Sequence, residues 1–142
     1  PANIKAACSI LDACISHIYH QRMLEVRNLD TAQQIEKYIN DNIAWDLSIE
    51  HLCAHFSVSR AELYQIFHTS FNSSVADYIR SKRISMAEQM IRSTSMQISE
   101  IASNVGFYDY NYFSKVFHRK FGCSPREYRK KLESGSEAAD KK

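Results

Sequence analysis

Side chains suited to reading nucleic-acid bases gather in two stretches of the sequence. Gln65 and Asn111 carry amides, and each amide can form two hydrogen bonds with one adenine. Lys115, close to Asn111, can donate to the N7 and O6 atoms of guanine. Because these residue types occur at two separate places, the elements that carry both places must be worked out from the surrounding pattern.

Metal and catalytic chemistry have less support. His51 and His55 are four residues apart, which places two imidazoles on one helical face, but two ligands do not make a structural metal site. No C-x-x-C pair occurs among the four cysteines, which we expect to be reduced thiols: Cys8, Cys14, Cys53 and Cys123. We therefore predict no metal, no cofactor and no catalytic residue, and we expect that the protein is not an enzyme.

The charge is unevenly distributed along the chain. The 142 residues carry a formal net charge of +2. Residues 1–58 sum to −3, residues 59–131 to +6 and residues 132–142 to −1. The basic middle segment contains both polar stretches, so it fits a polyanionic partner.

Composition restricts the fold class and the compartment. Hydrophobic residues make up 44% of the chain, while 3 Gly and 2 Pro are too few for an all-β fold. No apolar run is long enough to span a membrane, and residues 1–5 (PANIK) do not begin a signal peptide. We expect a cytoplasmic protein and, since the chain begins with Pro rather than Met, a fragment or a processed form.

The beginning of the chain has a helical apolar stripe. Ile4, Leu11 and Ile18 recur on one face with other apolar residues between them, which predicts an amphipathic helix over about residues 3–27. The stripe includes small and polar positions that are poor coiled-coil material, so dimerisation through this helix is one alternative and packing on other parts of the protein is another.

A second helix is expected to follow after a break. The sequence at residues 28–30 (NLD) is expected to end the first helix, and Thr31 with Gln34 has the form of a capping box. The next helix should then run to a point near Trp45.

Two later segments repeat each other. Five positions match at an offset of 49: Leu52/Ile101, Cys53/Ala102, Phe56/Val105, Ser57/Gly106 and Val58/Phe107. Five more match at an offset of 50: Ser59/Asp109, Leu63/Phe113, Ile66/Val116, Phe67/Phe117 and Phe71/Phe121. The extra residue falls at Tyr108, in the second turn.

Each repeat predicts a short helix, a tight turn and a second helix. This is the helix-turn-helix arrangement, in which the second helix enters the DNA major groove. A connector helix over residues 75–93 would be about 28 Å long, so it can place two recognition helices about one DNA turn (~34 Å) apart. Duplicated helical hairpins that bind only other proteins remain the alternative.

The expected fold is therefore all-α, with two helix-turn-helix subdomains joined by a long connector helix and preceded by an N-terminal amphipathic helix. The predicted boundaries are residues 1–30 for a linker or dimerisation helix, 31–132 for the double helix-turn-helix domain (first unit 31–74, connector 75–93, second unit 94–132) and 133–142 for a disordered tail.

The sequence resembles the DNA-binding domain of AraC/XylS-type regulators. The resemblance is carried by residues 46–53 (DLSIEHLC), 58–67 (VSRAELYQIF), 98–102 (ISEIA), 105–107 (VGF), 110–117 (YNYFSKVF) and 121–129 (FGCSPREYR). Two departures are Cys53, where Ala is usual, and Ser57, where the first turn often has Gly and where we expect a strained or reshaped turn.

The resemblance implies a bacterial transcription regulator, with activation as its expected mode. The implied partners are double-stranded promoter DNA and RNA polymerase. Such proteins carry a separate effector-sensing or receiver domain, and the helix at residues 3–27 would lead from it. Homodimer formation is expected either through this helix or through that separate N-terminal domain.

The candidate DNA-binding residues are those on the second helix of each unit that do not face the predicted core. They are Arg60, Ala61, Tyr64, Gln65 and His68 in the first unit, and Tyr110, Asn111, Tyr112, Ser114, Lys115 and Arg119 in the second. The candidate phosphate contacts are Arg80, Lys82, Arg83, Arg126 and Arg129. Internal ion pairs are the alternative for Arg83 and Arg129.

Overall fold

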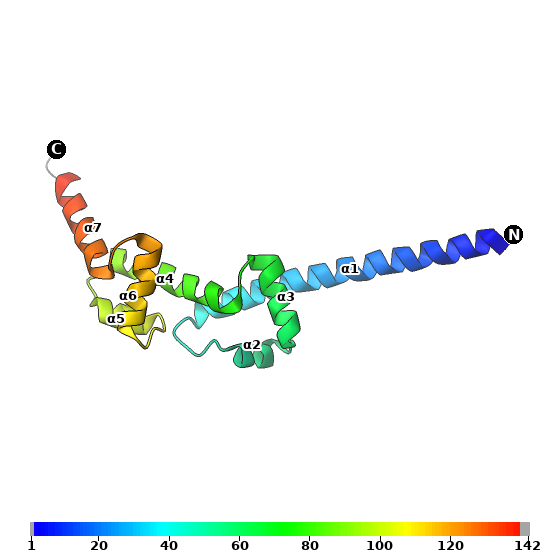
Figure 1. Cartoon of the computed structure of the whole chain (residues 1–142), viewed down its shortest axis with the longest axis horizontal. Coiled ribbons are helices and arrows are strands. Elements are labelled where there is room, and N and C mark those ends of the chain that lie inside the picture. Colours follow the sequence, from blue (N-terminus) through cyan, green and yellow to red (C-terminus); the bar gives the residue numbers. More distant parts are fainter. Residues whose placement is uncertain (1, 140–142) are drawn as a thin grey trace.

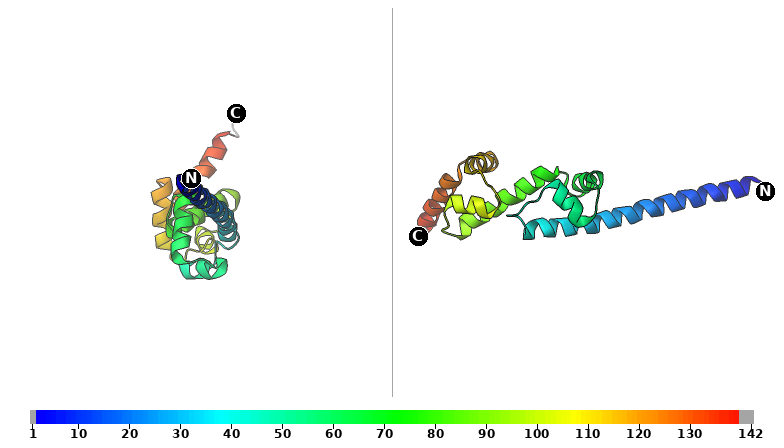
Figure 2. Two further views of the ribbon diagram at one scale, coloured as in Figure 1. Left: turned by 90° about the vertical axis from the view of Figure 1, so that its right-hand side faces the viewer. Right: turned by 90° about the horizontal axis from the view of Figure 1, so that it is seen from below.

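The computed structural model describes residues 2–139, which form seven α-helices and no β-strand (Figure 1). The helices are α1 (Ala2–Asp41), α2 (Ile49–Phe56), α3 (Arg60–Phe71), α4 (Val75–Ser93), α5 (Ile98–Asn104), α6 (Tyr110–Phe121) and α7 (Pro125–Ala139). The expected all-α fold is confirmed. Most of α1 projects away from the other helices, which gather along α4 (Figures 1 and 2).

The short helices begin where the sequence supplies a capping side chain. Ser48 Oγ accepts from the His51 backbone N–H at the start of α2. Ser59 and Glu62 form a complete capping box at the start of α3. The Asp109 carboxylate caps α6, because it accepts from the backbone N–H groups of Asn111 and Tyr112.

Two separate hydrophobic cores lie on α4. Val75 and Ile79 belong to the first core, whereas Ile84, Ala87 and Ile91 belong to the second. The first core also holds residues of α1, α2, α3 and the loop between α1 and α2: Ala32, Ile35, Ile39, Ile43, Leu47, Leu52, Leu63, Ile66 and Phe67. The second also holds residues of α5, α6 and the turn between them: Ile98, Ile101, Ala102, Val105, Phe107, Phe113, Val116 and Phe117. The connector helix thus contributes to both units.

The predicted break at residues 28–30 is wrong, because α1 is continuous from Ala2 to Asp41. The Thr31 hydroxyl donates to the Arg27 carbonyl at 2.9 Å, and the Gln34 amide donates to the Asp30 carboxylate at 3.1 Å. Both side chains therefore bind within the helix instead of capping a new one. The segment also lacks Gly and Pro, the residues that interrupt helices most strongly.

The apolar stripe of the first part of α1 is exposed. Ile4, Leu11 and Ile18 retain 70%, 59% and 57% of their accessible surface. No helix of the described chain, α1 included, has both the length and the hydrophobicity needed to cross a membrane.

The segment predicted as a disordered tail is helical as far as Ala139, the end of α7. The prediction rested on the lack of core-forming residues, but a helix that continues from a packed turn needs only residues of good helix propensity such as Lys, Leu, Glu and Ala. The remaining residues of the expected tail, 140–142, lie outside the described part of the chain.

Candidate nucleic-acid interface

The backbone follows the same path through the turn of each predicted unit. In the first unit, the Val58 N–H donates to the Cys53 carbonyl at 3.1 Å, and in the second the Phe107 N–H donates to the Ala102 carbonyl at 2.9 Å. These four residues occupy matching positions of the repeat. The bonds close the turn in the same way in each unit, so α3 follows α2 as α6 follows α5.

Each turn passes through one residue with positive φ. Ser57 has φ 52° and Gly106 has φ 88°. A non-glycine residue in this region carries a cost of about 1–2 kcal/mol. Ser57 therefore keeps the left-handed conformation that a glycine would adopt, and the turn is strained rather than reshaped.

The repeat also includes the helix that follows each recognition helix. Aromatic rings pack together at matching positions, with centroids 4.4–5.4 Å apart in the first unit and 4.5–5.5 Å apart in the second. The matching rings are Phe67, Phe71 and Tyr78, and Phe117, Phe121 and Tyr128. Sequence reasoning missed this third element, although the recurring spacing Phe-x₃-Phe-x₆-Tyr was available as a signal.

Each of these tyrosines also donates to a glutamate on a helix three elements earlier in the chain. The Tyr78 hydroxyl donates to the Glu36 carboxylate of α1 at 2.9 Å, and the Tyr128 hydroxyl donates to the Glu88 carboxylate of α4 at 2.6 Å. The hydrogen bond from Lys82, followed by that from Tyr78, lowers the pKa of Glu36. The two bonds anchor the third helix of each unit to the helix that precedes the unit.

The candidates of the first unit lie on the outer face of α3. All five are exposed: Arg60, Ala61, Tyr64, Gln65 and His68. The Arg60 guanidinium forms an ion pair with Glu50 of α2, and both side chains remain mostly exposed. The predicted face is therefore assembled on one side of one helix, with its cation already paired.

The candidates of the second unit lie on α6. Asn111, Tyr112, Lys115 and Arg119 are exposed, whereas Tyr110 and Ser114 are half-buried. One surface depression is lined by Tyr110, Asn111, Ser114 and Lys115, together with His118 and Ser124. The Arg126 guanidinium of α7 lies 5.9 Å from the centre of the Tyr110 ring. The structure thus brings most of the second set together at one site.

The two recognition helices differ in charge. In α3 the charges of Arg60 and Glu62 cancel, giving a net charge of 0. In α6 the cations are Lys115, Arg119 and Lys120, and there is no acid, giving +3. Lys120 donates to Ser85 of α4 at 2.8 Å, so one of these three charges lies against the connector.

Two of the candidate phosphate contacts are used inside the fold. The Arg83 guanidinium donates to the carbonyls of Ile43 and Trp45, both at 3.0 Å. The Arg129 guanidinium donates to the carbonyls of Met96 and Thr94, at 2.6 and 3.2 Å. The partners are backbone carbonyls, not the carboxylates that the alternative of internal ion pairs would need.

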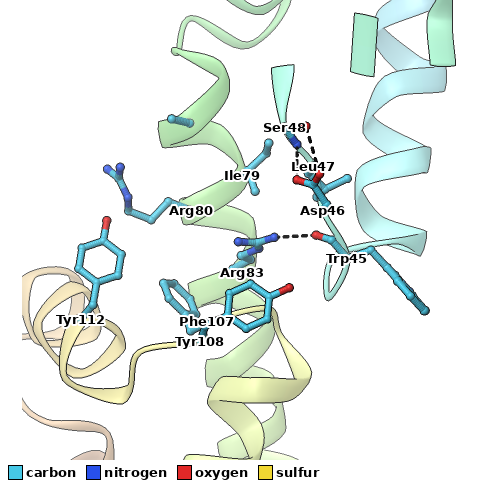
Figure 3. Close-up of a pocket in the computed structure, with 11 residues that line it drawn as sticks. Trp45, Asp46, Leu47, Ser48, Ile79, Arg80, Arg83, Phe107, Tyr108 and Tyr112 are labelled. Atoms are coloured by element: carbon cyan, nitrogen blue, oxygen red, sulfur yellow. Dashed lines mark hydrogen bonds between the residues drawn. The ribbon is translucent and has the colours of Figure 1, made fainter. Parts of the chain in front are cut away.

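The other phosphate candidates are more accessible. Arg80 pairs with Asp77 at 2.6 Å within α4, and Lys82 pairs with Glu36 at 2.8 Å. Arg126 is exposed beside Tyr110. Arg126 thus lies beside the first residue of α6, and Arg80 lies beside Tyr112 of the same helix (Figure 3).

The histidine pair on α2 belongs to an aromatic cluster. The Tyr38 hydroxyl lies 2.8 Å from His51 Nε2, and the Tyr38 ring stacks on His55 with centroids 4.1 Å apart. Among the described residues, no group of three or more potential metal ligands lies together.

Comparisons with known proteins agree with this geometry. A family described as "Helix-turn-helix domain" matches residues 52–131. The transcriptional activator RhaR of Cronobacter sakazakii is 33% identical over 100 residues, which are 70% of this chain and 35% of RhaR. The regulatory protein SoxS of Escherichia coli is 33% identical over 104 residues, which are 68% of this chain and 97% of SoxS.

A solved structure shows the same fold. A transcriptional regulator described as AraC-type and DNA-binding, from Chromobacterium violaceum, superposes with a TM-score of 0.65 at 26% identity, over 76% of this chain and 94% of that one. The chain spans only about a third of the length of RhaR (35%), whereas it spans nearly all of SoxS (97%).

Proposed function

The chain belongs to the AraC-type helix-turn-helix family, and on that premise we propose that it binds specific sites on double-stranded DNA as a bacterial transcription regulator. In this proposal α3 and α6 enter successive major grooves of one duplex. The observation that supports it is the pair of exposed polar helix faces. Each face is held by a matching set of three helices, α2–α4 for α3 and α5–α7 for α6.

The residues of the two faces have different proposed roles. Gln65 of α3 and Asn111 of α6 read adenine, and Lys115 reads guanine. Ala61 packs against a thymine methyl group. Tyrosine hydroxyls of α6 and the guanidinium of Arg126 bind phosphate oxygens, which orients the protein on the duplex.

A binding experiment tests this assignment. DNA selected from a random pool with the wild-type protein is titrated in gel-shift assays against the wild type and Lys115→Ala. We expect Lys115→Ala to lose about 1–3 kcal/mol of binding free energy on the selected site and to discriminate less at one position. Lys37→Ala, at an exposed position of α1, removes the same charge outside both faces and serves as the matched control.

Two results would contradict the proposal. Equal affinity of the wild-type protein for all sequences would favour a helical protein-interaction module, which is the second candidate function. An equal loss of affinity for Lys115→Ala and Lys37→Ala would remove Lys115 from the base-reading face while leaving DNA binding itself intact.

The mode of regulation is part of the same proposal. The name of RhaR describes an activator, which supports activation by this chain as well. RNA polymerase would then be a protein partner in the cytoplasm. A promoter that carries the selected site should give more transcript in a purified transcription reaction when the protein is added, and repression would overturn this part of the proposal.

We also propose that the exposed part of α1 pairs with α1 of a second copy. Ile4, Leu11 and Ile18 stand seven residues apart on one exposed face, with Ala7 and Cys14 between them at heptad positions. Further along, the same seven-residue series reaches Glu25, and only Ala32 and Ile39 beyond it are buried in the first core. The apolar stripe ends at Glu25, so the proposed pairing is confined to the exposed residues 4–18.

The native cysteines give a direct test of this pairing. In a parallel pair, the two Cys14 side chains face each other at the seam, so mild oxidation should yield a Cys14–Cys14 cross-linked dimer. The variant Cys14→Ser should abolish the cross-link and Cys8→Ser should retain it. Sedimentation as a monomer at all concentrations, with no cross-link, would contradict the homodimer, and a Cys8–Cys14 cross-link would contradict the parallel orientation.

A further inference from the structure

Arg83 lies where the two units meet on α4. Along this helix, Ile79 packs in the first core and Ile84 in the second, so Arg83 stands at their boundary. Its guanidinium donates to the carbonyls of Ile43 and Trp45, which follow the C-terminal end of α1. Figure 3 shows the bond to Trp45. One side chain of the connector therefore holds the loop that follows α1.

The turn of the second unit presses on the same place. Gly106 is buried, and a Cβ atom on it would lie 2.8 Å from the Ile43 carbonyl oxygen and 2.9 Å from Arg83 Cζ. Both distances are shorter than real Cβ contacts. The backbone of the second turn thus lies directly against the guanidinium and against the carbonyl that the guanidinium binds. Figure 3 shows the neighbouring Phe107 and Tyr108 beside Arg83.

The charge of Arg83 makes this contact hard to rearrange. Burial lowers the pKa of Arg83, while the nearby Tyr108 and Asp46 act in the opposite direction, and an arginine remains protonated throughout the physiological range. A partly buried cation needs hydrogen-bond partners, and the two carbonyls supply them. Any rocking of one unit against the other would separate the cation from these partners or move the turn into them.

We infer that Arg83 and Gly106 form a positioning contact that fixes the orientation of α3 relative to α6, and thereby the spacing between the two DNA half-sites that the chain accepts. The inference rests on the proposed function. A helix alone defines this orientation less firmly, since long helices bend gently. A rotation of about 10° between the units would move a recognition helix by about 6 Å over the ~34 Å that separates successive major-groove sites.

The first arm of the test needs no DNA. Residual dipolar couplings of the backbone amides report the orientation of each unit in the wild type, Arg83→Lys and Gly106→Ala. Arg83→Lys keeps the charge but cannot donate to two carbonyls from a planar fork. We expect one alignment tensor for the wild type and two different tensors for both variants. Arg92→Lys, an exposed arginine further along α4, is the matched control and should keep one tensor.

The second arm uses the selected DNA site with one or two base pairs inserted between its halves. The wild type should lose at least 10-fold in affinity on insertion, and Arg83→Lys should lose no more than about 3-fold. A loss of stability alone would weaken binding to all spacings equally. Gly106→Ala places a Cβ against the backbone of Ile43. If Gly106→Ala fails to fold for this reason, Arg83→Lys alone carries the test.

The outcomes separate this inference from the proposed function. Two tensors in the wild type, or one tensor and an unchanged spacing preference in folded Arg83→Lys, would overturn the positioning contact. Absence of any sequence preference in the wild type would overturn the proposed function, whereas the dipolar couplings would still decide whether Arg83 orients the units.

Discussion

The two helix-turn-helix units share their internal packing and hydrogen bonds, which form a common frame, and they differ in the exposed surface of the recognition helix. Matching turn bonds, aromatic trios and tyrosine–glutamate bonds build each unit. The recognition helix α3 nevertheless has a net charge of 0, whereas α6 has +3. Because buried residues define the frame and exposed residues the face, duplication could keep the first while the second diverged.

The difference indicates a division of labour on DNA. In α3, Arg60 is paired with Glu50, and the exposed groups that remain are mostly neutral donors and acceptors such as Gln65. In α6, Lys115 and Arg119 are exposed, and in the proposed complex they bind phosphates or guanine. The electrostatic part of the affinity should therefore come mainly from the second unit.

The turns differ for a reason that lies outside each unit. Ser57 and Gly106 both have positive φ, but only Gly106 is pressed against another unit. A serine can occupy the first turn at a moderate conformational cost, whereas the second turn has no room for a side chain. The junction between units thus explains why the glycine is present in one copy and absent from the other.

The largest expected effect tests that explanation. We expect Gly106→Ala to lower the free energy of unfolding by about 2–4 kcal/mol, since it adds both a positive-φ penalty and an overpacked methyl group. Ser57→Ala should change it by less than about 1 kcal/mol, because the conformational penalty is already present in the wild type. Urea unfolding of both variants measures the difference, and equal losses would break the comparison.

The division of labour on DNA is tested by two variants, one in each recognition helix. Gln65→Ala should cost about 1–3 kcal/mol at one base position and leave the salt dependence of binding unchanged. Arg119→Gln should weaken binding similarly to all sequences and reduce the slope of log K against log salt by about 1. Titrations at four salt concentrations measure both, and a changed slope for Gln65→Ala would contradict the division.

The two anchoring glutamates should differ in their contribution to stability. The Glu88 side chain is 16% exposed and that of Glu36 is 42% exposed. Burial raises the pKa of Glu88, but hydrogen bonds from Tyr128 and Arg92 outweigh it and hold the pKa below its ordinary 4.5. Such a group stabilises the fold above its ordinary pKa, and this contribution disappears as the pH falls through the lowered value.

We therefore expect Glu88→Gln to lower the free energy of unfolding at neutral pH by about 1 kcal/mol, and Glu36→Gln to lower it by less. Both differences from the wild type should shrink as the pH falls below the ordinary carboxyl pKa of 4.5 and through the lowered pKa of each native carboxyl. Chemical unfolding across this pH range measures them. A difference that grows on acidification would mean that the carboxylates do not stabilise the fold.

The smallest expected effect concerns the cation of the first unit. Glu50→Gln should change the free energy of unfolding by less than about 0.5 kcal/mol, because both side chains of its ion pair with Arg60 are exposed. It should raise DNA affinity by about 2–3-fold, since it releases Arg60 and removes a negative charge near the phosphates. Unchanged affinity would show that Arg60 does not face DNA.

The parts of the fold that follow from local pattern were predictable. The connector predicted over residues 75–93 is α4, because Ser74 caps its start and Ser93 precedes an extended residue. The break in α1 was wrong because capping residues also bind within helices, as Thr31 does. The helical course of residues 133–139 was missed because composition reports on core formation more than on helix propensity.

The candidate faces were predictable in part. Helical periodicity is enough to place Gln65 and Lys115 on exposed surfaces, and their contacts with DNA remain predictions. The use of Arg83 was not predictable, because its partners are backbone carbonyls, which every residue possesses and no side-chain pattern marks.

The continuity of α1 has a mechanical consequence. Its 40 residues form a rod about 60 Å long, and its last turns, with Ala32, Ile35 and Ile39, are part of the first core. A torque applied at the far end is thus delivered to the DNA-reading unit without an intervening hinge. Each residue inserted into the exposed part would rotate the far end of α1 by about 100° about the helix axis. The rotational position of that end, and not only its distance, therefore determines the direction of the force on the first unit.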